Sequence, residues 1–310
     1  MYPVRWQRKL RFKLYQIIAI SNSLLLRREG FMKKKIKYLF VSILMLMVFI
    51  MCYSRYMEPE RLVVKEITVE TDMDIENCRV VFFTDTHFGE LYDEKHIERI
   101  VEMINEREAD IVIFGGDLLD NYARDREILD LEYLQTELSR IEAKTGKYAV
   151  FGNHDYGGGA VRIYADFMNG CGFHVLDDET VFLEEFNMEI NGFDDYLLGQ
   201  TEEDFYHIQS DYFHLIATHE PVISRLMEGS GESFILSGHT HGGQVSVPYF
   251  TKKLLPNGSD RFIKGLYDTQ DIGADTFARM YVSSGIGMTK YPFRFLNVPE
   301  IIEVNLIRKE

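Results

Sequence analysis

The segment Gly238-His239-Thr240-His241-Gly242-Gly243-Gln244, which follows a short apolar run, constrains this chain more than any other. His239 and His241 stand two residues apart, and in an extended segment such residues point to the same side. The glycines allow the backbone to turn sharply at this place. Because imidazole is the commonest metal ligand among side chains, the loop is a candidate part of a metal site. A His-x-His pair alone is weak evidence, so the upstream sequence must supply the other ligands.

Four upstream apolar runs end in a similar way, on Asp, Asn or His. These runs and their polar ends occupy residues 80–87, 111–117, 148–155 and 215–219. Short apolar runs bounded by glycine or polar residues predict strands that are buried on both faces. In open α/β sheets, binding sites lie just beyond the C-terminal ends of such strands. Taken singly, Asp85 could be a helix cap, Asp117 a turn residue and His219 a packed histidine. Taken together they favour a cation, because grouped carboxylates are costly to bury without one.

In this order the motifs resemble the calcineurin-like metallophosphoesterase superfamily. They are Asp85-Thr86-His87, Gly115-Gly116-Asp117-Leu118-Leu119-Asp120, Gly152-Asn153-His154-Asp155, the single His219, and Gly238-His239-Thr240-His241. Two further features are similar to the membrane-anchored bacterial phosphodiesterase branch, the YaeI/YkuE-like proteins. They are the longer histidine segment and the ending Tyr291-Pro292-Phe293-Arg294 followed by Pro299-Glu300-Ile301. The resemblance runs from about Arg79 to the C-terminus. It implies an α/β fold, the four-layer α-β-β-α sandwich of the superfamily.

The resemblance also implies a role for each candidate residue. One metal ion would be held by Asp85, His87 and His241, and a second by Asn153, His219 and His239, with Asp117 bridging the two. His154 would face the substrate and stabilise or protonate the departing oxygen, with Asp155 orienting its ring. This mixed ligand set suits manganese, zinc or iron better than magnesium.

Such a metal pair implies a reaction. Two ions roughly 3.5–4 Å apart share a water, lower its pKa and clamp both oxygens of an in-line displacement. The implied activity is hydrolysis of a phosphodiester or phosphoanhydride bond by a metal-bridging hydroxide, which makes the chain a metal-dependent phosphoric ester hydrolase.

The net charge restricts the classes of partner that the chain can bind, and the cysteine content bears on disulfide bonds. Its 310 residues carry a net charge of −15, whereas nucleic-acid binding needs a basic face, so no nucleic acid is expected. A phosphate substrate remains compatible, because two divalent metals dominate the local field. The three widely spaced cysteines give no disulfide framework. A Cys78–Cys171 bridge and two unpaired thiols both remain open.

Residues 38–53 form an unbroken apolar run that directly follows a group of four lysines. The run is short for a hydrocarbon core of ~30 Å, but Lys37 and Arg55 can extend it by placing their charged ends at the interface. The lysines predict a cytoplasmic N-terminal side and an extracytoplasmic C-terminal part. Because no small-x-small cleavage site follows, an uncleaved single-pass signal anchor is favoured over a cleaved signal peptide. We therefore expect a cell-membrane protein whose catalytic domain lies outside.

The expected organisation has four parts. A basic N-terminal tail over 1–37 precedes the anchor at 38–53, a linker at 54–61 and the catalytic domain at 62–310. Met32 and the three lysines after it resemble the start of a bacterial signal anchor. We predict that translation begins at Met32 and that residues 1–31 are absent from the native protein; a short cytoplasmic tail is the alternative.

Within the catalytic domain, the spacing of apolar residues predicts helices over 93–108 and 125–141, the second with Ile128 on its apolar face. These helices alternate with the predicted strands as successive βαβ units. Alternation predicts a further strand over 62–70. Residues 249–267 combine aromatic and basic side chains. We interpret them as a loop over the site, and our hypothesis is that they touch anionic lipid or a lipid-linked phosphate.

Several functions remain open beside a phosphodiesterase acting on a lipid- or cell-wall-linked phosphate ester. One is a pyrophosphatase of a lipid-linked nucleotide sugar, which only the shape of the pocket would separate from a phosphodiesterase. A non-catalytic scaffold is another, although such proteins are expected to lose ligands and none is missing here. A nuclease is disfavoured by the acidic charge and the membrane tether.

Overall fold

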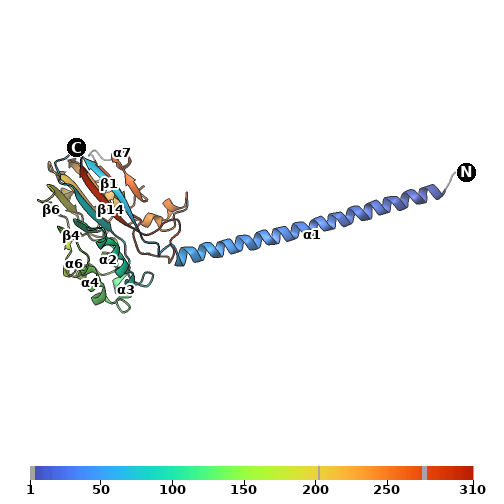
Figure 1. The fold of residues 1–310 in the computed structure, drawn as a ribbon, viewed down its shortest axis with the longest axis horizontal. Coiled ribbons are helices and arrows are strands. Elements are labelled where there is room, and N and C mark those ends of the chain that lie inside the picture. The colour runs from blue at the N-terminus through green and yellow to red at the C-terminus, as the bar shows by residue number, and fades with distance from the viewer. Residues whose placement is uncertain (1–3, 202, 274–277, 310) are drawn as a thin grey trace. The chain divides into compact units, whose positions relative to one another are not determined.

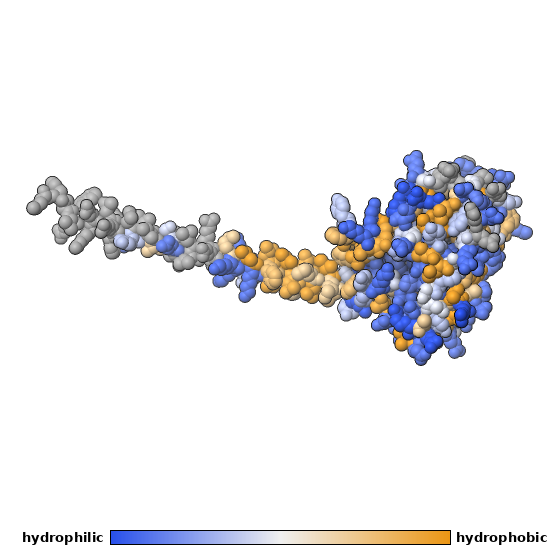
Figure 2. Space-filling model, turned by 180° about the vertical axis from the view of Figure 1, so that it is seen from behind, coloured by the Kyte–Doolittle hydropathy of each residue, from blue (hydrophilic) through white to orange (hydrophobic). Residues whose placement is uncertain are grey.

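The computed structural model describes residues 4–201, 203–273 and 278–309, which form two compact units, Met1–Tyr53 and Ser54–Glu310. A single helix, α1 (Val4–Tyr56), makes up the first unit and ends inside the second. Its segment Phe31–Tyr56 is long and apolar enough to cross a membrane, judged by length and composition. Figure 2 shows most of this stretch as an orange, hydrophobic band along the helix. This segment contains the span predicted at 38–53. The bounds of the span and the start at Met32 stay predictions.

The second unit is built around two six-stranded sheets (Figure 1). The first has the order β1 (Val63–Thr71), β14 (Glu300–Arg308), β2 (Cys78–Phe83), β3 (Ile111–Phe114), β4 (Gly146–Ala149) and β5 (His174–Val175). The second has the order β12 (Gly265–Tyr267), β13 (Ala278–Val282), β11 (Ser233–Ser237), β9 (Phe213–Thr218), β7 (Met188–Gly192) and β6 (Glu179–Leu183). The short strands β8 (His207–Gln209) and β10 (Glu228–Ser230) pair separately.

Most neighbouring strands run parallel. In the first sheet β2, β3, β4 and β5 are parallel, with Val80 opposite Ile111, whereas β14 and its parallel neighbour β1 run in the opposite direction. In the second sheet β7, β9, β11 and β13 are parallel, with Ser233 opposite His214. Helices complete the connections, as predicted from the alternation of patterns. They are α2 (Ile97–Asn105), α3 (Tyr122–Asp125), α4 (Leu131–Ser139), α5 (Asn153–Gly157), α6 (Val161–Gly170) and α7 (Thr269–Ile272), with 3-10 turns η1 (Glu94–His96), η2 (Glu203–Tyr206), η3 (Pro221–Arg225), η4 (His241–Gly243) and η5 (Thr251–Lys253).

Three apolar cores separate the layers. Successive residues of β2 face opposite sides: Val81 and Phe83 pack under α2, α4 and α6, whereas Val80 and Phe82 pack against the second sheet. Figure 1 shows those helices together on one side of the first sheet. A third core covers the outer face of the second sheet with η3 and α7. The predicted four-layer α-β-β-α sandwich is confirmed, and its fourth layer is thin.

Two sequence-based expectations differ from the structure. The helix predicted over 125–141 begins only at Leu131, because the Asp130 side chain accepts the Tyr133 N–H and caps it. Ile128 therefore lies in the preceding turn, where 61% of it is exposed, and its predicted place on an apolar face is wrong. Residues 54–61 are not a free linker either. Ser54 and Glu58 are buried, and the Ser54 carbonyl accepts the Arg294 N–H at 3.0 Å.

Candidate metal centre

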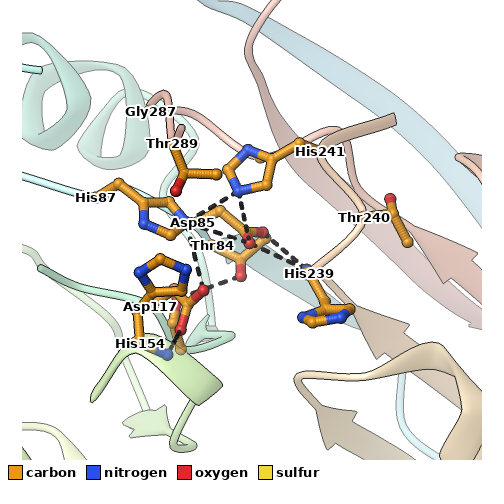
Figure 3. Close-up of polar contacts among 12 residues, drawn as sticks. Thr84, Asp85, His87, Asp117, His154, His239, Thr240, His241, Gly287 and Thr289 are labelled. Carbon is orange, nitrogen blue, oxygen red and sulfur yellow. Dashed lines mark hydrogen bonds and ion pairs between the residues drawn. The ribbon is translucent and has the colours of Figure 1, made fainter. Parts of the chain in front are cut away.

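The five motifs follow the C-terminal ends of five strands, as predicted. Strands β2, β3 and β4 of the first sheet and β9 and β11 of the second end at one edge of the sandwich. Figure 3 shows Asp85, His87, Asp117 and His241 with their polar ends turned toward one another at this edge. The structure thus brings together all seven residues predicted as metal ligands.

The backbone is strained at most of these ligand candidates. Five of them have positive φ angles, namely Asp85 (55°), His87 (43°), Asp117 (58°), His239 (69°) and His241 (49°). A residue other than glycine in this region costs on the order of 1–3 kcal/mol, and such residues cluster at functional sites. Gly116 permits the closest approach of two loops, because a Cβ on it would lie 2.6 Å from the Gly152 nitrogen. The sharp turns aim the side chains back over the sheet edge.

The first group of donors consists of Asp85, His87 and His241. The two Nε2 atoms of the histidines lie 2.9 Å apart, and Asp85 Oδ1 lies 3.4 Å from that of His241 and 3.9 Å from that of His87. Ligand atoms of all three fall within 4.8 Å of one another. This is the set that the resemblance assigned to the first metal ion.

The second group consists of Asn153, His219 and His239. His219 Nδ1 donates to the Gly115 carbonyl at 2.8 Å, which leaves the lone pair on Nε2, and this buried atom has no hydrogen-bond partner. His239 Nε2 donates to the Asn257 carbonyl at 2.5 Å, which leaves the lone pair on Nδ1, 2.9 Å from Asn153 Oδ1. A lone pair that faces an amide oxygen has no proton to share with it. A cation bound by both atoms would resolve this conflict.

Asp117 lies between the two groups. Its Oδ2 is 3.3 Å from His87 Nε2 and 3.2 Å from His219 Nε2, and its Oδ1 accepts the His154 N–H at 2.7 Å. One carboxylate oxygen therefore faces a nitrogen of each donor group. This is the position that a bridging ligand requires.

The electrostatics of His239 and His241 agree with such a use. Burial lowers the pKa of His239 to about 3, with help from His219, and burial together with His87 and Arg294 lowers that of His241. Both rings are thus neutral, the form in which imidazole binds metals. Burial raises the pKa of Asp85, against the opposing effect of His219. Buried carboxylates of this kind need a paired positive charge, and the donor set fits two divalent cations.

His154 faces the cavity, as predicted, but the residue that orients its ring is not the predicted one. His154 Nδ1 donates to the Asp120 carbonyl oxygen at 2.6 Å, and the Asp120 carboxylate lies 3.6 Å from it. Asp155 instead accepts backbone N–H groups of Asp117 (2.9 Å), Leu118 (3.2 Å) and Gly152 (2.9 Å). The expectation that Asp155 orients the His154 ring is therefore wrong. Asp155 holds two ligand-bearing loops in register.

Asp120 was missed as a site residue, although it closes the motif Gly-Gly-Asp-x-x-Asp. Its Oδ1 lies 3.3 Å from His87 Nδ1, so it can fix the tautomer whose Nε2 faces the first donor group. Burial alone would raise the pKa of Asp120, but the nearby His87 ring and the hydrogen bond from Arg124 lower it well below its ordinary value. The carboxylate is therefore ionised.

We expect Asp120→Asn to weaken metal binding by roughly 10–100-fold, the usual effect of losing an outer partner of a ligand histidine. Titration of the apoprotein with Mn²⁺ measures this affinity. Asp125→Asn is the matched control, because Asp125 is also buried and also pairs with Arg124 but contacts none of the histidines. Equal affinities in the wild type and Asp120→Asn would remove Asp120 from the site.

A cavity of about 220 Å³ opens over the donor groups. Its floor includes Asp117, Asn153 and His154. Its walls combine apolar side chains with a few polar ones and include Val245, Leu254, Pro256, Gln244, Thr289, Lys290 and Tyr291. A phosphate ester reaching the floor would therefore lie against a largely apolar wall.

A buried network supports His241 from behind. Arg294, which is fully buried, donates to the carbonyls of Ser284 and Gly287 at 3.0 and 2.7 Å and lies 3.5 Å from His241 Nδ1. The Asn297 amide donates to the His241 carbonyl, and Glu58 accepts the Asn297 backbone N–H. The motif ending in Arg294 was noted in the sequence, but its contact with the histidine loop was not predictable.

The fold and the site define an α/β protein with a buried centre of Asp, Asn and His side chains suited to two metal ions. Residues 78–243, more than half of the chain, match the family described as calcineurin-like phosphoesterase. The chain belongs to this family, and the predicted membership of the superfamily is confirmed.

Three relatives show where in the family the chain falls. It is 29% identical over 260 residues to a Bacillus subtilis (strain 168) protein named uncharacterized metallophosphoesterase YkuE, with 80% of this chain and 87% of that protein covered. An uncharacterized metallophosphoesterase of Helicobacter pylori (strain J99) is 30% identical over 254 residues, covering 79% and 64%. A Danio rerio protein named transmembrane protein with metallophosphoesterase domain is 26% identical over 266 residues, covering 80% and 58%. The matched part of the chain spans less than two thirds of the length of the latter two proteins. The similarity to YkuE confirms the predicted YkuE-like branch.

Proposed function

We propose that this protein is a dinuclear metal-dependent phosphodiesterase, active on phosphodiester or phosphoanhydride bonds at the outer face of the cell membrane. The observation that carries the proposal is the position of Asp117 Oδ2, which lies 3.2–3.3 Å from a ring nitrogen of each donor group. Asp85, His87 and His241 would hold one ion, and Asn153, His219 and His239 the other. Such a pair, when bound, supplies Lewis acidity and an acidified water.

The remaining chemistry falls to side chains of the chain itself. His154 lines the cavity, and its Nδ1–H is held by the Asp120 carbonyl. Its Nε2 is thereby left for the substrate, where the doubly protonated imidazolium form can give its Nε2 proton to the departing oxygen and become neutral. Asp155 keeps the loops that carry Asp117 and Asn153 at a fixed separation through its three backbone contacts.

Support for the membrane location comes from α1. Its Phe31–Tyr56 segment is apolar enough to span a bilayer, and a related Danio rerio protein carries the word transmembrane in its name. The four lysines at the start of this segment favour a cytoplasmic N-terminus. Digestion of the catalytic domain by protease added outside intact spheroplasts tests this orientation, and full protection would contradict it.

Removing the metal should abolish activity. We expect the purified full-length protein, supplied with Mn²⁺, to hydrolyse bis(p-nitrophenyl) phosphate through the two-metal centre, and to do so faster than the monoester p-nitrophenyl phosphate if it is a phosphodiesterase. Chelation should remove both activities, and Mn²⁺, Zn²⁺ or Fe²⁺ should restore them to different degrees. A preference for the monoester would refute the phosphodiesterase assignment. Inactivity toward both, with two ions bound, would favour a non-catalytic scaffold.

A further inference from the structure

Three short segments form one continuous rim beside the cavity: residues 54–58, 244–256 and 290–297. The Ser54 carbonyl accepts the Arg294 N–H at 3.0 Å, and the Ser246 N–H donates to the Phe295 carbonyl at 2.8 Å. The Gln244 amide donates to the Tyr291 carbonyl at 2.6 Å. Several side chains of this rim, including those of Gln244 and Tyr291, also line the cavity. The entrance to the metal centre therefore opens on the rim.

Exposed apolar side chains concentrate on this rim. Of the sixteen large apolar side chains that are exposed in the described part of Ser54–Glu310, seven lie on its 26 residues. They are Tyr56, Met57, Tyr249, Phe250, Leu254, Tyr291 and Leu296, with exposures from 51% for Leu254 to 94% for Tyr249. A grouping of this kind on a soluble surface marks an interaction site.

The charge of the rim is opposite to that of the chain. The whole chain carries a net charge of −15, yet the rim has a single carboxylate, Glu58, and that side chain is buried. Lys252, Lys253 and Lys290 are exposed there, and none of them takes part in an ion pair with a described residue. The exposed charge of the rim is therefore wholly positive.

We propose that the rim docks onto an anionic phospholipid bilayer and that the metal centre takes its phosphoester from the lipid surface. Aromatic rings and lysines together are typical of segments at the membrane interface, and lysines near an anionic surface strengthen the attachment. Covalent continuity supports the same occupant, because the apolar segment of α1 ends at Tyr56, which belongs to the rim. The docking stands on the rim alone, whereas the lipid-borne substrate rests on the proposed phosphodiesterase function.

The docking is tested with the full-length protein in vesicles of phosphatidylcholine, with and without phosphatidylglycerol. Trp6, the sole tryptophan, is changed to Phe, and Phe250→Trp then reports contact with brominated lipids. Ile128→Trp in the same background is the matched control, since Ile128 is 61% exposed and Phe250 62%. We expect lipid quenching at position 250, stronger with phosphatidylglycerol, and none at position 128. Equal quenching at both positions, or cross-links between two copies through residue 250, would overturn the docking.

The charge contribution is tested with Lys252→Glu/Lys253→Glu, against Lys95→Glu/Arg126→Glu as a control pair of exposed cations. Soluble bis(p-nitrophenyl) phosphate measures the integrity of the metal centre, and hexadecyl p-nitrophenyl phosphate in the vesicles measures access from the bilayer. We expect the rim variant to keep its rate on the soluble ester and to lose roughly tenfold on the lipid ester. Equal rates of the rim variant and wild type on the lipid ester would refute uptake from the bilayer. Quenching at position 250 without hydrolysis of either ester would support the docking but contradict the phosphodiesterase function.

Discussion

Asp117→Ala should release both metal ions and abolish hydrolysis. Its Oδ2 faces His87 and His219 from the two donor groups, so the change removes a ligand from each ion at once. We expect both metal affinity and kcat/KM to fall by more than the ~10–100-fold that loss of an outer partner costs. Elemental analysis after dialysis against a fixed concentration of Mn²⁺, together with the diester assay, measures both quantities.

A control separates loss of metal from loss of fold. Asp125→Ala removes another buried carboxylate, whose side chain pairs with Arg124 and touches none of the proposed ligands. It should keep two ions per chain and most of the activity, although its stability falls with the loss of that pair. Full metal content and full rate in Asp117→Ala would show that the centre is wrongly assigned.

His154→Ala should lower kcat by about 10²–10⁴-fold while two ions stay bound, which is the usual size of a lost general acid. The His154 contact with Asp117 uses the backbone N–H, so alanine keeps it. The deficit should be largest for esters with poor leaving groups, because an alkoxide needs a proton and p-nitrophenolate leaves without one. The readout is therefore kcat measured over a series of leaving groups.

The dependence on leaving group distinguishes proton donation from a structural role. If the ring only packs beside His87, which it meets edge-on with centroids 4.5 Å apart, the loss should be the same for every ester. Such a uniform loss, or a fall in metal content, would contradict the assignment of His154 as the acid.

His154 and Asp155 show which contacts cannot be predicted from the sequence, although the two residues are adjacent. The His154 ring was expected to pair with Asp155, its neighbour in sequence, but α5 begins at Asn153 and directs the Asp155 carboxylate to three backbone N–H groups. The ring instead meets Asp120, which is 34 residues away. Adjacency in sequence does not determine which side chains meet, because rotation about a turn of helix sends consecutive residues in different directions.

The linker illustrates the same limit. Residues 54–61 follow an apolar segment, and the sequence predicted a short linker there. The structure buries Glu58 against the backbone of Asn297, 239 residues further on, and Asn297 in turn holds the His241 carbonyl. Contacts at such separations leave no periodic trace in a single sequence.

The sequence by itself determined the family, the strand ends and the identity of the donor side chains, because those features reside in local runs and in short motifs with fixed spacing. It also indicated a segment of α1 apolar enough to span a membrane. Only the tertiary structure decided how donors from two different sheets share Asp117, which residue orients His154, and that the cavity opens on an apolar, basic rim. Those relations depend on the packing of two sheets against a common core, where segments distant in the chain become neighbours in space.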